Sequence, residues 1–140
     1  ENIKSYIAIE KARFGDRLNV VYDIPDNIDF DLPALIIQPL VENAVKHGIF
    51  EKVEGGTVEI IALDNGRETE LIVKDNGVGM EEELLRSLFD GKDDSTSIGL
   101  KNVNHRLKNK YGEDHGLIIE SKLGCGTTVK MKVPKEVRRL

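Results

Sequence analysis

Two pairs of strand-like segments, each joined by a glycine turn, limit the folds open to this chain more than any other feature. Residues 57–63 lead into Asn65-Gly66, a pair typical of tight hairpin turns, and a second aliphatic segment follows at once. Residues 117–122 and 127–133 flank a second glycine turn in the same way. Each pair predicts an antiparallel hairpin, so most of the sheet is expected to be antiparallel.

The remaining apolar residues follow one further strand pattern and several helical patterns. Apolar residues alternate from Leu18 to Ile24 and predict a strand that ends at Pro25. Helical spacing predicts helices at residues 2–13, 33–47, 81–89 and 99–110. The expected fold is α+β: a two-layer α/β sandwich with a mixed, mostly antiparallel sheet and helices on one face. The order of the strands cannot be read from the sequence.

Size and charge narrow the class of protein. The chain has 140 residues, 39% of them hydrophobic, which predicts about one soluble domain with a real core. Its net charge of -5 argues against a nucleic-acid or anionic-membrane surface, and we expect no nucleic-acid partner. Its apolar runs are too short to span a bilayer, so we expect no membrane insertion of this fragment. Because the chain begins with Glu1 rather than Met, we expect it to be a piece of a longer protein.

Asp75-Asn76-Gly77-Val78-Gly79 is the strongest candidate for a ligand site. The Asp75 carboxylate accepts hydrogen bonds only, so it suits the exocyclic amine of adenine and opposes the carbonyl oxygen of guanine. Gly77 and Gly79 would let the backbone approach a flat ring, and Met80 would pack against the base. The commoner meaning of such residues is an ordinary Asn-Gly turn.

The expected helix 33–47 carries a polar face opposite its core face. Asn43, Lys46 and His47 fall together at positions i, i+3 and i+4. An amide oxygen is a suitable Mg²⁺ ligand beside phosphates, and an ammonium can pair with a phosphate. Taken alone, this face is more often a solvated surface near the end of a helix. The opposite face carries the expected core residues Ile37, Leu40, Val41 and Ala44.

The helix that begins near Gly99 offers a possible phosphate site. Free N–H groups at a helix start attract anions, Thr96 or Ser97 can cap the helix, and Lys101 adds positive charge. Residues 90–97 have no aliphatic side chain and predict a loop that closes as a lid. An ordinary capped helix explains the same residues.

The last hairpin brings one more polar group. Gly124-Cys125-Gly126 is read as its turn, and the hydroxyl of Thr127 would reach a base edge directly or through water. His105 is expected on a solvated helix face and His115 in a loop.

Together these motifs resemble the ATP-binding domain of the gyrase, heat-shock-chaperone, histidine-kinase and MutL superfamily. Residues 35–48, with Glu42 and Asn43 near the centre, are similar to the autolysin-sensor (LytS-like) class of sensor histidine kinases. Residues 10–14 and 99–107 support this resemblance, which covers nearly the whole chain. The resemblance implies a histidine-kinase ATPase-like fold with ATP and Mg²⁺ as cofactors.

The resemblance also implies roles for individual residues. Asn43 would coordinate Mg²⁺, Lys46 would contact phosphate, and His47 would lie against the ribose and adenine. Asp75, flanked by Gly77 and Gly79, would bind the adenine amine, and Thr127 would support that end of the pocket. Gly99 and Leu100 would offer backbone N–H groups to the phosphates, and Glu42 would help to position a reacting group.

Two residues depart from the family pattern. Pro39 stands where many relatives carry a polar residue four positions before the magnesium asparagine, so a gyrase-type water-activating glutamate is missing and efficient hydrolysis is not expected. Ser97 replaces a glycine often found two residues before Gly99, which would stiffen the phosphate loop.

The resemblance implies an organisation and a set of partners. Residues 1–14 would be the end of a linker helix from a missing dimerisation bundle, 15–135 the ATP-binding catalytic domain, and 136–140 a tail. The domain would take ATP, release ADP, phosphorylate a histidine on the dimerisation domain of its parent, and signal to a response regulator. The parent would be a membrane-anchored sensor with this domain in the cytoplasm.

Two other functions remain open from the sequence. An anti-sigma-type serine kinase shares the ATP fold and would be complete at about this length. A non-catalytic module would bind nucleotide only to regulate an assembly.

Overall fold

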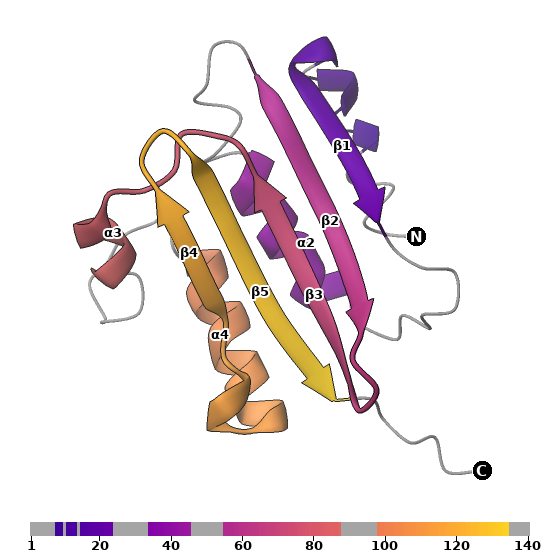
Figure 1. Ribbon diagram of the computed structural model, residues 1–140, viewed down its shortest axis with the longest axis vertical. Helices are drawn as coiled ribbons and strands as arrows, with labels where there is room; N and C mark the ends of the chain where they lie inside the picture. The colour runs from indigo at the N-terminus through magenta and orange to yellow at the C-terminus, as the bar shows by residue number, and fades with distance from the viewer. Residues whose placement is uncertain are drawn as a thin grey trace.

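The computed structural model describes residues 8–9, 11–13, 15–23, 34–45, 55–87 and 98–134. These residues form one mixed sheet with helices against one of its faces (Figure 1). The elements are η1 (Gly15–Arg17), β1 (Leu18–Asp23), α2 (Ala34–Asn43), β2 (Gly56–Asp64), β3 (Glu68–Asp75), α3 (Glu82–Ser87), α4 (Ile98–Tyr111), η4 (Glu113–His115), β4 (Ile118–Lys122) and β5 (Gly126–Pro134). The expected two-layer α+β sandwich is confirmed.

The five strands lie in the order β1-β2-β3-β5-β4. Strand β1 is parallel to β2, and every other neighbouring pair is antiparallel. Both expected hairpins are present, β2 with β3 and β4 with β5. Strand β5 pairs with β3, and β4 is the edge strand beside β5. The two hairpins therefore join through β3 and β5 in the interior of the sheet.

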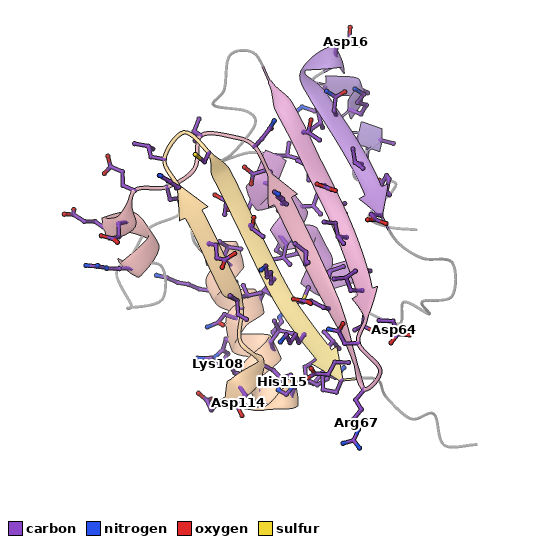
Figure 2. All side chains as sticks on the ribbon, in the orientation of Figure 1. Asp16, Asp64, Arg67, Lys108, Asp114 and His115 are labelled. Carbon is purple, nitrogen blue, oxygen red and sulfur yellow. The ribbon has the colours of Figure 1, made fainter. Side chains whose placement is uncertain are left out.

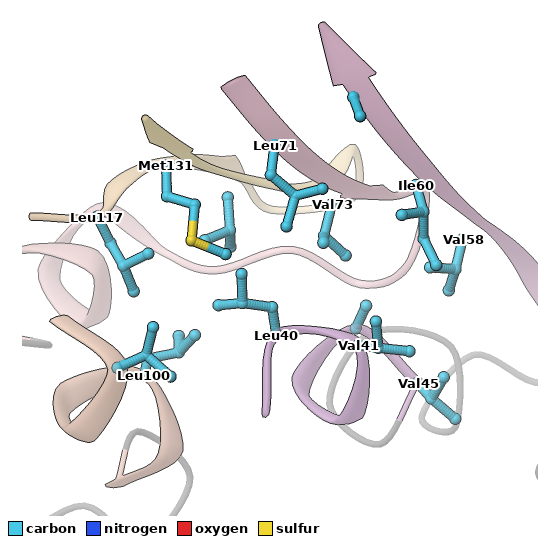
Figure 3. Close-up of a cluster of buried hydrophobic side chains, with 14 of the residues drawn as sticks. Leu40, Val41, Val45, Val58, Ile60, Leu71, Val73, Leu100, Leu117 and Met131 are labelled. Atoms are coloured by element: carbon cyan, nitrogen blue, oxygen red, sulfur yellow. The ribbon is translucent and has the colours of Figure 1, made fainter. Parts of the chain in front are cut away.

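The core lies between the sheet and the helices, and aliphatic side chains supply it (Figure 3). Leu40, Val41 and Ala44 are buried, as the helical pattern predicted, whereas the side chain of Ile37 lies outside the described residues. In α4, Leu100, Val103 and Leu107 fill the same layer. The sheet contributes Leu18, Val58, Ile60, Ala62, Leu71, Val73, Val129, Met131 and Val133.

The first hairpin differs from expectation in its turn. Gly66 has a φ of 92°, and Asn65 does not have positive φ, so Asn65-Gly66 alone does not form a type I′ turn. Asp64 pairs with Thr69, and the Gly66 N–H donates to the Asp64 carboxylate at 2.9 Å. The loop is therefore wider than two residues, and a side chain rather than a second left-handed residue stabilises it.

Some element bounds and one histidine also need correction. His115 does not lie in an irregular loop: it belongs to η4, is partly buried, and its Nε2 lies 3.1 Å from a Glu68 carboxylate oxygen. Figure 2 shows His115 at the foot of α4. His105 is exposed, as expected. The helix expected at 81–89 is described over Glu82–Ser87, and the lid expected at 90–97 lies outside the described residues.

Candidate functional site

Helix α2 and strand β3 end, and helix α4 begins, at the same edge of the molecule, where strand β2 starts. A parallel β1–β2 pair needs a crossover that returns to the start of β2, so α2 ends near that start. Strand β3 ends there too, because Val58 pairs with Asp75. The contact between His115 and Glu68 fixes the end of α4 at the opposite end of the sheet, so α4 begins near the end of β3. Figure 1 shows this arrangement.

Asp75 is the buried acid of this end. It is 4% exposed and continues the helix-facing side of β3, after the core residues Leu71 and Val73. A buried carboxylate needs hydrogen-bond donors, and the Gly77 N–H donates to Asp75 Oδ1 at 2.9 Å. The carboxylate therefore faces the helix layer rather than the open side of the sheet.

Asn76 holds the turn that follows Asp75. The Thr57 N–H donates to Asn76 Oδ1 at 2.7 Å, and the Asn76 N–H donates to the Thr57 carbonyl at 3.3 Å. This pair of bonds ties the end of β3 to β2. The turn interpretation and the ligand interpretation therefore apply to different residues: Asn76 makes the turn, and the turn fixes the position of Asp75.

The close approach of two loops explains two of the glycines. Gly79 has a φ of 71°, and a Cβ there would lie 2.0 Å from the Lys122 carbonyl oxygen. Gly126 has a φ of 100°, and a Cβ there would lie 2.0 Å from the Asp75 carbonyl oxygen. The β4–β5 hairpin therefore already requires glycine at position 79, a reason that the sequence did not reveal.

Thr127 lies directly beside Asp75 on the neighbouring strand. The two are register partners on β5 and β3, and Thr127 is 7% exposed. Its hydroxyl oxygen lies 2.8 Å from Ser121 Oγ, and Ser121 also accepts a hydrogen bond from the Met80 N–H at 2.9 Å. Sequence reasoning missed Ser121, because only the strand order brings β4 to this end of the sheet.

Met80 ends the glycine loop and makes two contacts with its surroundings. Its partly buried side chain packs against the aliphatic core, and its backbone is bonded to Ser121. The contacts in the structure therefore make Met80 a link between the glycine loop and the core.

The phosphate end of the site is described in part. Asn43 is the last residue of α2, and both Asn43 and Glu42 are partly buried. Helix α4 begins at Ile98, and the side chain of Leu100 is buried in the core, so Leu100 can offer only its backbone to a ligand. Gly99 lies in the same first turn, and Lys101 is partly buried just after it.

Three expected site residues, Lys46, His47 and Ser97, lie outside the described residues. Among the residues that are described, no cluster of three or more His, Cys, Asp or Glu side chains could hold a metal ion. An Mg²⁺ ion held by the Asn43 amide oxygen would share its coordination with oxygen atoms of phosphates and water, which is the usual way that proteins bind Mg²⁺ with a nucleotide.

The comparisons with known proteins agree with this fold. Residues 28–137 match the family of histidine kinase-, DNA gyrase B- and HSP90-like ATPases. The chain belongs to this family. Similar proteins point to a narrower class within the family. The chain is 42% identical to the sensor histidine kinase YpdA of Escherichia coli K12, with 96% of this chain and 23% of that protein covered. It is 35% identical to the sensor protein LytS of Staphylococcus haemolyticus, with 96% and 24% covered.

Solved structures share the fold. The catalytic domain of the histidine kinase ThkA superposes with a TM-score of 0.68 at 17% identity, covering 94% of this chain and 90% of that one. The histidine kinase domain from Erythrobacter litoralis EL346 gives a TM-score of 0.64 at 19% identity, covering 91% and 56%. The expected resemblance to sensor histidine kinases, the LytS-like class among them, is confirmed.

This chain corresponds to only part of its relatives. It spans about half the length (51%) of the Bacillus subtilis relative YwpD, at 43% identity, and about a quarter of YpdA and LytS. In the described part of the chain, no helix is both long and apolar enough to cross a bilayer.

Proposed function

We propose that this chain binds Mg-ATP at the end of the sheet where α2 and β3 end and α4 begins, and that it donates the γ-phosphoryl group to a histidine. One observation carries the proposal: a buried carboxylate, Asp75, lies beside a buried hydroxyl, Thr127, on the helix-facing side of the sheet. A carboxylate accepts hydrogen bonds only, so a carboxylate at this place suits an exocyclic amine, which donates.

Different elements of the fold would bind the base and the phosphates. Asp75 accepts a hydrogen bond from the adenine amine, Thr127 supports the same edge of the base, and the loop of Gly77 and Gly79 borders the ring. The first turn of α4 offers the backbone N–H groups of Gly99 and Leu100 to the phosphates, where the partial positive charge of a helix start favours anions.

Charge at the phosphates would come from side chains and from a metal. The amide oxygen of Asn43 suits Mg²⁺, and the ion would neutralise charge that develops on the phosphates during transfer. Lys46 and Lys101 would add positive charge, His47 would lie against the ribose and adenine, and Ser97 would cap the start of α4. Glu42 helps to position the reacting group.

Transfer to a histidine asks little more of this domain. An imidazole nitrogen of the acceptor attacks the γ-phosphorus, the bond to the bridging oxygen breaks, and ADP leaves. Such transfer depends mainly on position and charge stabilisation, so it proceeds without a water-activating acid. Pro39 occupies the position where other family members carry such an acid, which favours transfer over hydrolysis.

The acceptor histidine would belong to a dimerisation domain of the same parent protein, to which residues 1–14 connect, and 15–135 would form the catalytic domain, followed by the tail 136–140. The parent would be a membrane-anchored sensor with this domain in the cytoplasm, and a response regulator would receive the signal.

Calorimetric titration with ATP and GTP, with and without Mg²⁺, tests the binding. We expect ATP to bind and GTP to bind far more weakly. Labelled ATP with a separately supplied histidine-bearing bundle tests the transfer. Label on a serine of a partner protein would indicate an anti-sigma-type kinase, and ATP binding with no transfer would indicate a regulatory module.

A further inference from the structure

Three polar side chains form a row across the last three strands of the sheet. Asp75 on β3 is the register partner of Thr127 on β5, and Thr127 is the register partner of Ser121 on β4. Ser121 is partly buried and shares the helix-facing side of β4 with Ile119, which packs against the core. Ser121 thus lies one strand beyond the proposed base site.

Ser121 Oγ makes three short contacts, and their protons can be assigned. The Met80 N–H lies 2.9 Å away, the Gly126 carbonyl oxygen 2.9 Å away, and Thr127 Oγ1 2.8 Å away. The three contacts share three protons: one each from the Met80 amide, the Ser121 hydroxyl and the Thr127 hydroxyl. The carbonyl can only accept, so Ser121 donates to Gly126, and Thr127 then donates to Ser121.

This assignment fixes the direction of the Thr127 hydroxyl. Its single proton points toward β4, away from Asp75 on the opposite neighbouring strand. Thr127 therefore presents lone pairs, not a proton, on the Asp75 side, and Asp75 itself can only accept. Two adjacent acceptors favour a group that donates, such as an exocyclic amine or a bridging water, and they oppose a keto oxygen at the same position.

Ser121 also anchors the glycine loop. Its bond to the Met80 N–H holds the end of that loop, and the Gly124 N–H donates to the Val78 carbonyl at 2.7 Å. Two bonds thus attach the loop after Asp75 to the β4–β5 hairpin. The same serine controls both the proton of Thr127 and the position of the loop.

We propose that Ser121 is a positioning residue that sets the preference of this site for 6-aminopurine over 6-ketopurine nucleotides. It acts through the proton of Thr127 and through the backbone of Met80, without contact with the base. The inference rests on the proposed function, because the preference exists only where a purine binds at Asp75.

The test compares ADP with IDP, which carries a keto oxygen in place of the amine and an N1–H in place of the unprotonated N1, by calorimetry without metal. We expect Ser121→Ala to lower the preference for ADP by about three- to tenfold, the worth of one hydrogen bond, because the freed Thr127 hydroxyl can then donate to a keto oxygen. Ser121→Thr keeps the hydroxyl and should keep the preference. Thr128→Ala, on the other face of β5, is the control and should change neither affinity.

A double-mutant cycle separates positioning from general support. Thr127→Val should also lower the preference, and Ser121→Ala added to it should lower the preference no further, because both changes remove one interaction. An unchanged ratio of ADP to IDP affinity in Ser121→Ala overturns the inference, even if both affinities fall together. If circular dichroism shows that Ser121→Ala does not fold, Ser121→Cys is judged by the same ratio.

The controls keep this inference distinct from the proposed function. The proposed function fails if the unaltered chain does not bind ADP. If the unaltered chain binds ADP in preference to IDP and Ser121→Ala leaves that preference intact, only the role of Ser121 fails.

Discussion

Replacement of Asp75 by Asn tests the base site with little change to the fold. The side chain is 4% exposed, and its Oδ1 accepts the Gly77 N–H at 2.9 Å. Asn has almost the same volume and keeps one oxygen for Gly77. It replaces the other carboxylate oxygen with an amide NH₂, which is a donor and opposes the adenine amine. Asp75→Ala would instead leave the buried Gly77 N–H unpaired, at a cost of about 1–3 kcal/mol to stability, and would mix folding with binding.

The expected loss follows from one charged hydrogen bond. Such a bond is worth about 1.5–3 kcal/mol, which corresponds to a loss of affinity for ADP of roughly 10- to 150-fold. IDP should lose less, because an amide NH₂ can donate to its keto oxygen. The preference for ADP over IDP should therefore shrink or reverse.

The opposite end of the same hairpin supplies a matched control. Asp64 accepts the Gly66 N–H at 2.9 Å, two residues on, as Asp75 accepts that of Gly77, but Asp64 is exposed (Figure 2). Asp64→Asn makes the same chemical change and should leave both affinities as they are. Calorimetry measures the affinities, and thermal unfolding checks the fold. An Asp75→Asn variant that melts like the unaltered chain and binds ADP equally well would refute the assignment of the base site.

Three further predictions concern the metal, the glycines and pH. Asn43→Ala should weaken binding of Mg-ATP more than binding of metal-free ADP, and equal losses in two titrations would contradict a magnesium ligand there. Gly79→Ala and Gly126→Ala should each destabilise the fold by more than about 3 kcal/mol in denaturant unfolding, because a Cβ would lie 2.0 Å from a carbonyl oxygen. Gly124→Ala is the control: its φ of 84° imposes similar backbone strain, but no atom lies within 4 Å of the added Cβ, so it should cost less. Partial burial of the Tyr22 side chain raises its pKa from the ordinary value of 10.0, so the folded state favours the neutral phenol. The stability that Tyr22 contributes is then present below pH 10.0 and lost as pH rises through the raised pKa. The chain has three tyrosines, so the ultraviolet titration of Tyr22→Phe is subtracted from that of the unaltered chain, and the difference should have a higher midpoint in the folded than in the denatured state.

Local chemistry made the elements predictable. Alternating aliphatic residues and glycine turns act within a few residues of one another, so both hairpins and the core face of α2 followed from the sequence. The turn after Asp64 was harder, because a side-chain hydrogen bond replaced the second left-handed residue that a type I′ turn requires. The position of Asp75 was predictable for the same local reason: it ends a strand before two glycines.

The surroundings of Asp75 depend on long-range pairing that local patterns do not encode. Nothing near Ser121 in the sequence indicates that its hydroxyl belongs to a hydrogen-bond network at the site, since serine is common on edge strands. Its place follows from the insertion of β5 between β3 and β4, which aligns Asp75, Thr127 and Ser121 in one row. The glycine at position 79 has the same origin, because the carbonyl that excludes a Cβ belongs to Lys122 on the distant hairpin.

This strand order also decides which part of the fold would recognise the base. Helix α2 and the start of α4 are held to the sheet by aliphatic packing, which is non-directional and tolerates exchange of similar side chains. The row on β3, β5 and β4 is held by hydrogen bonds whose protons have one consistent arrangement. Hydrogen bonds are directional, so this row fixes which groups in the pocket donate and which accept. Apolar packing has no such effect. Selectivity for the base should therefore respond to changes in the β4–β5 hairpin, whereas changes on the core face of α2 should alter stability and leave the ratio of ADP to IDP affinity unchanged.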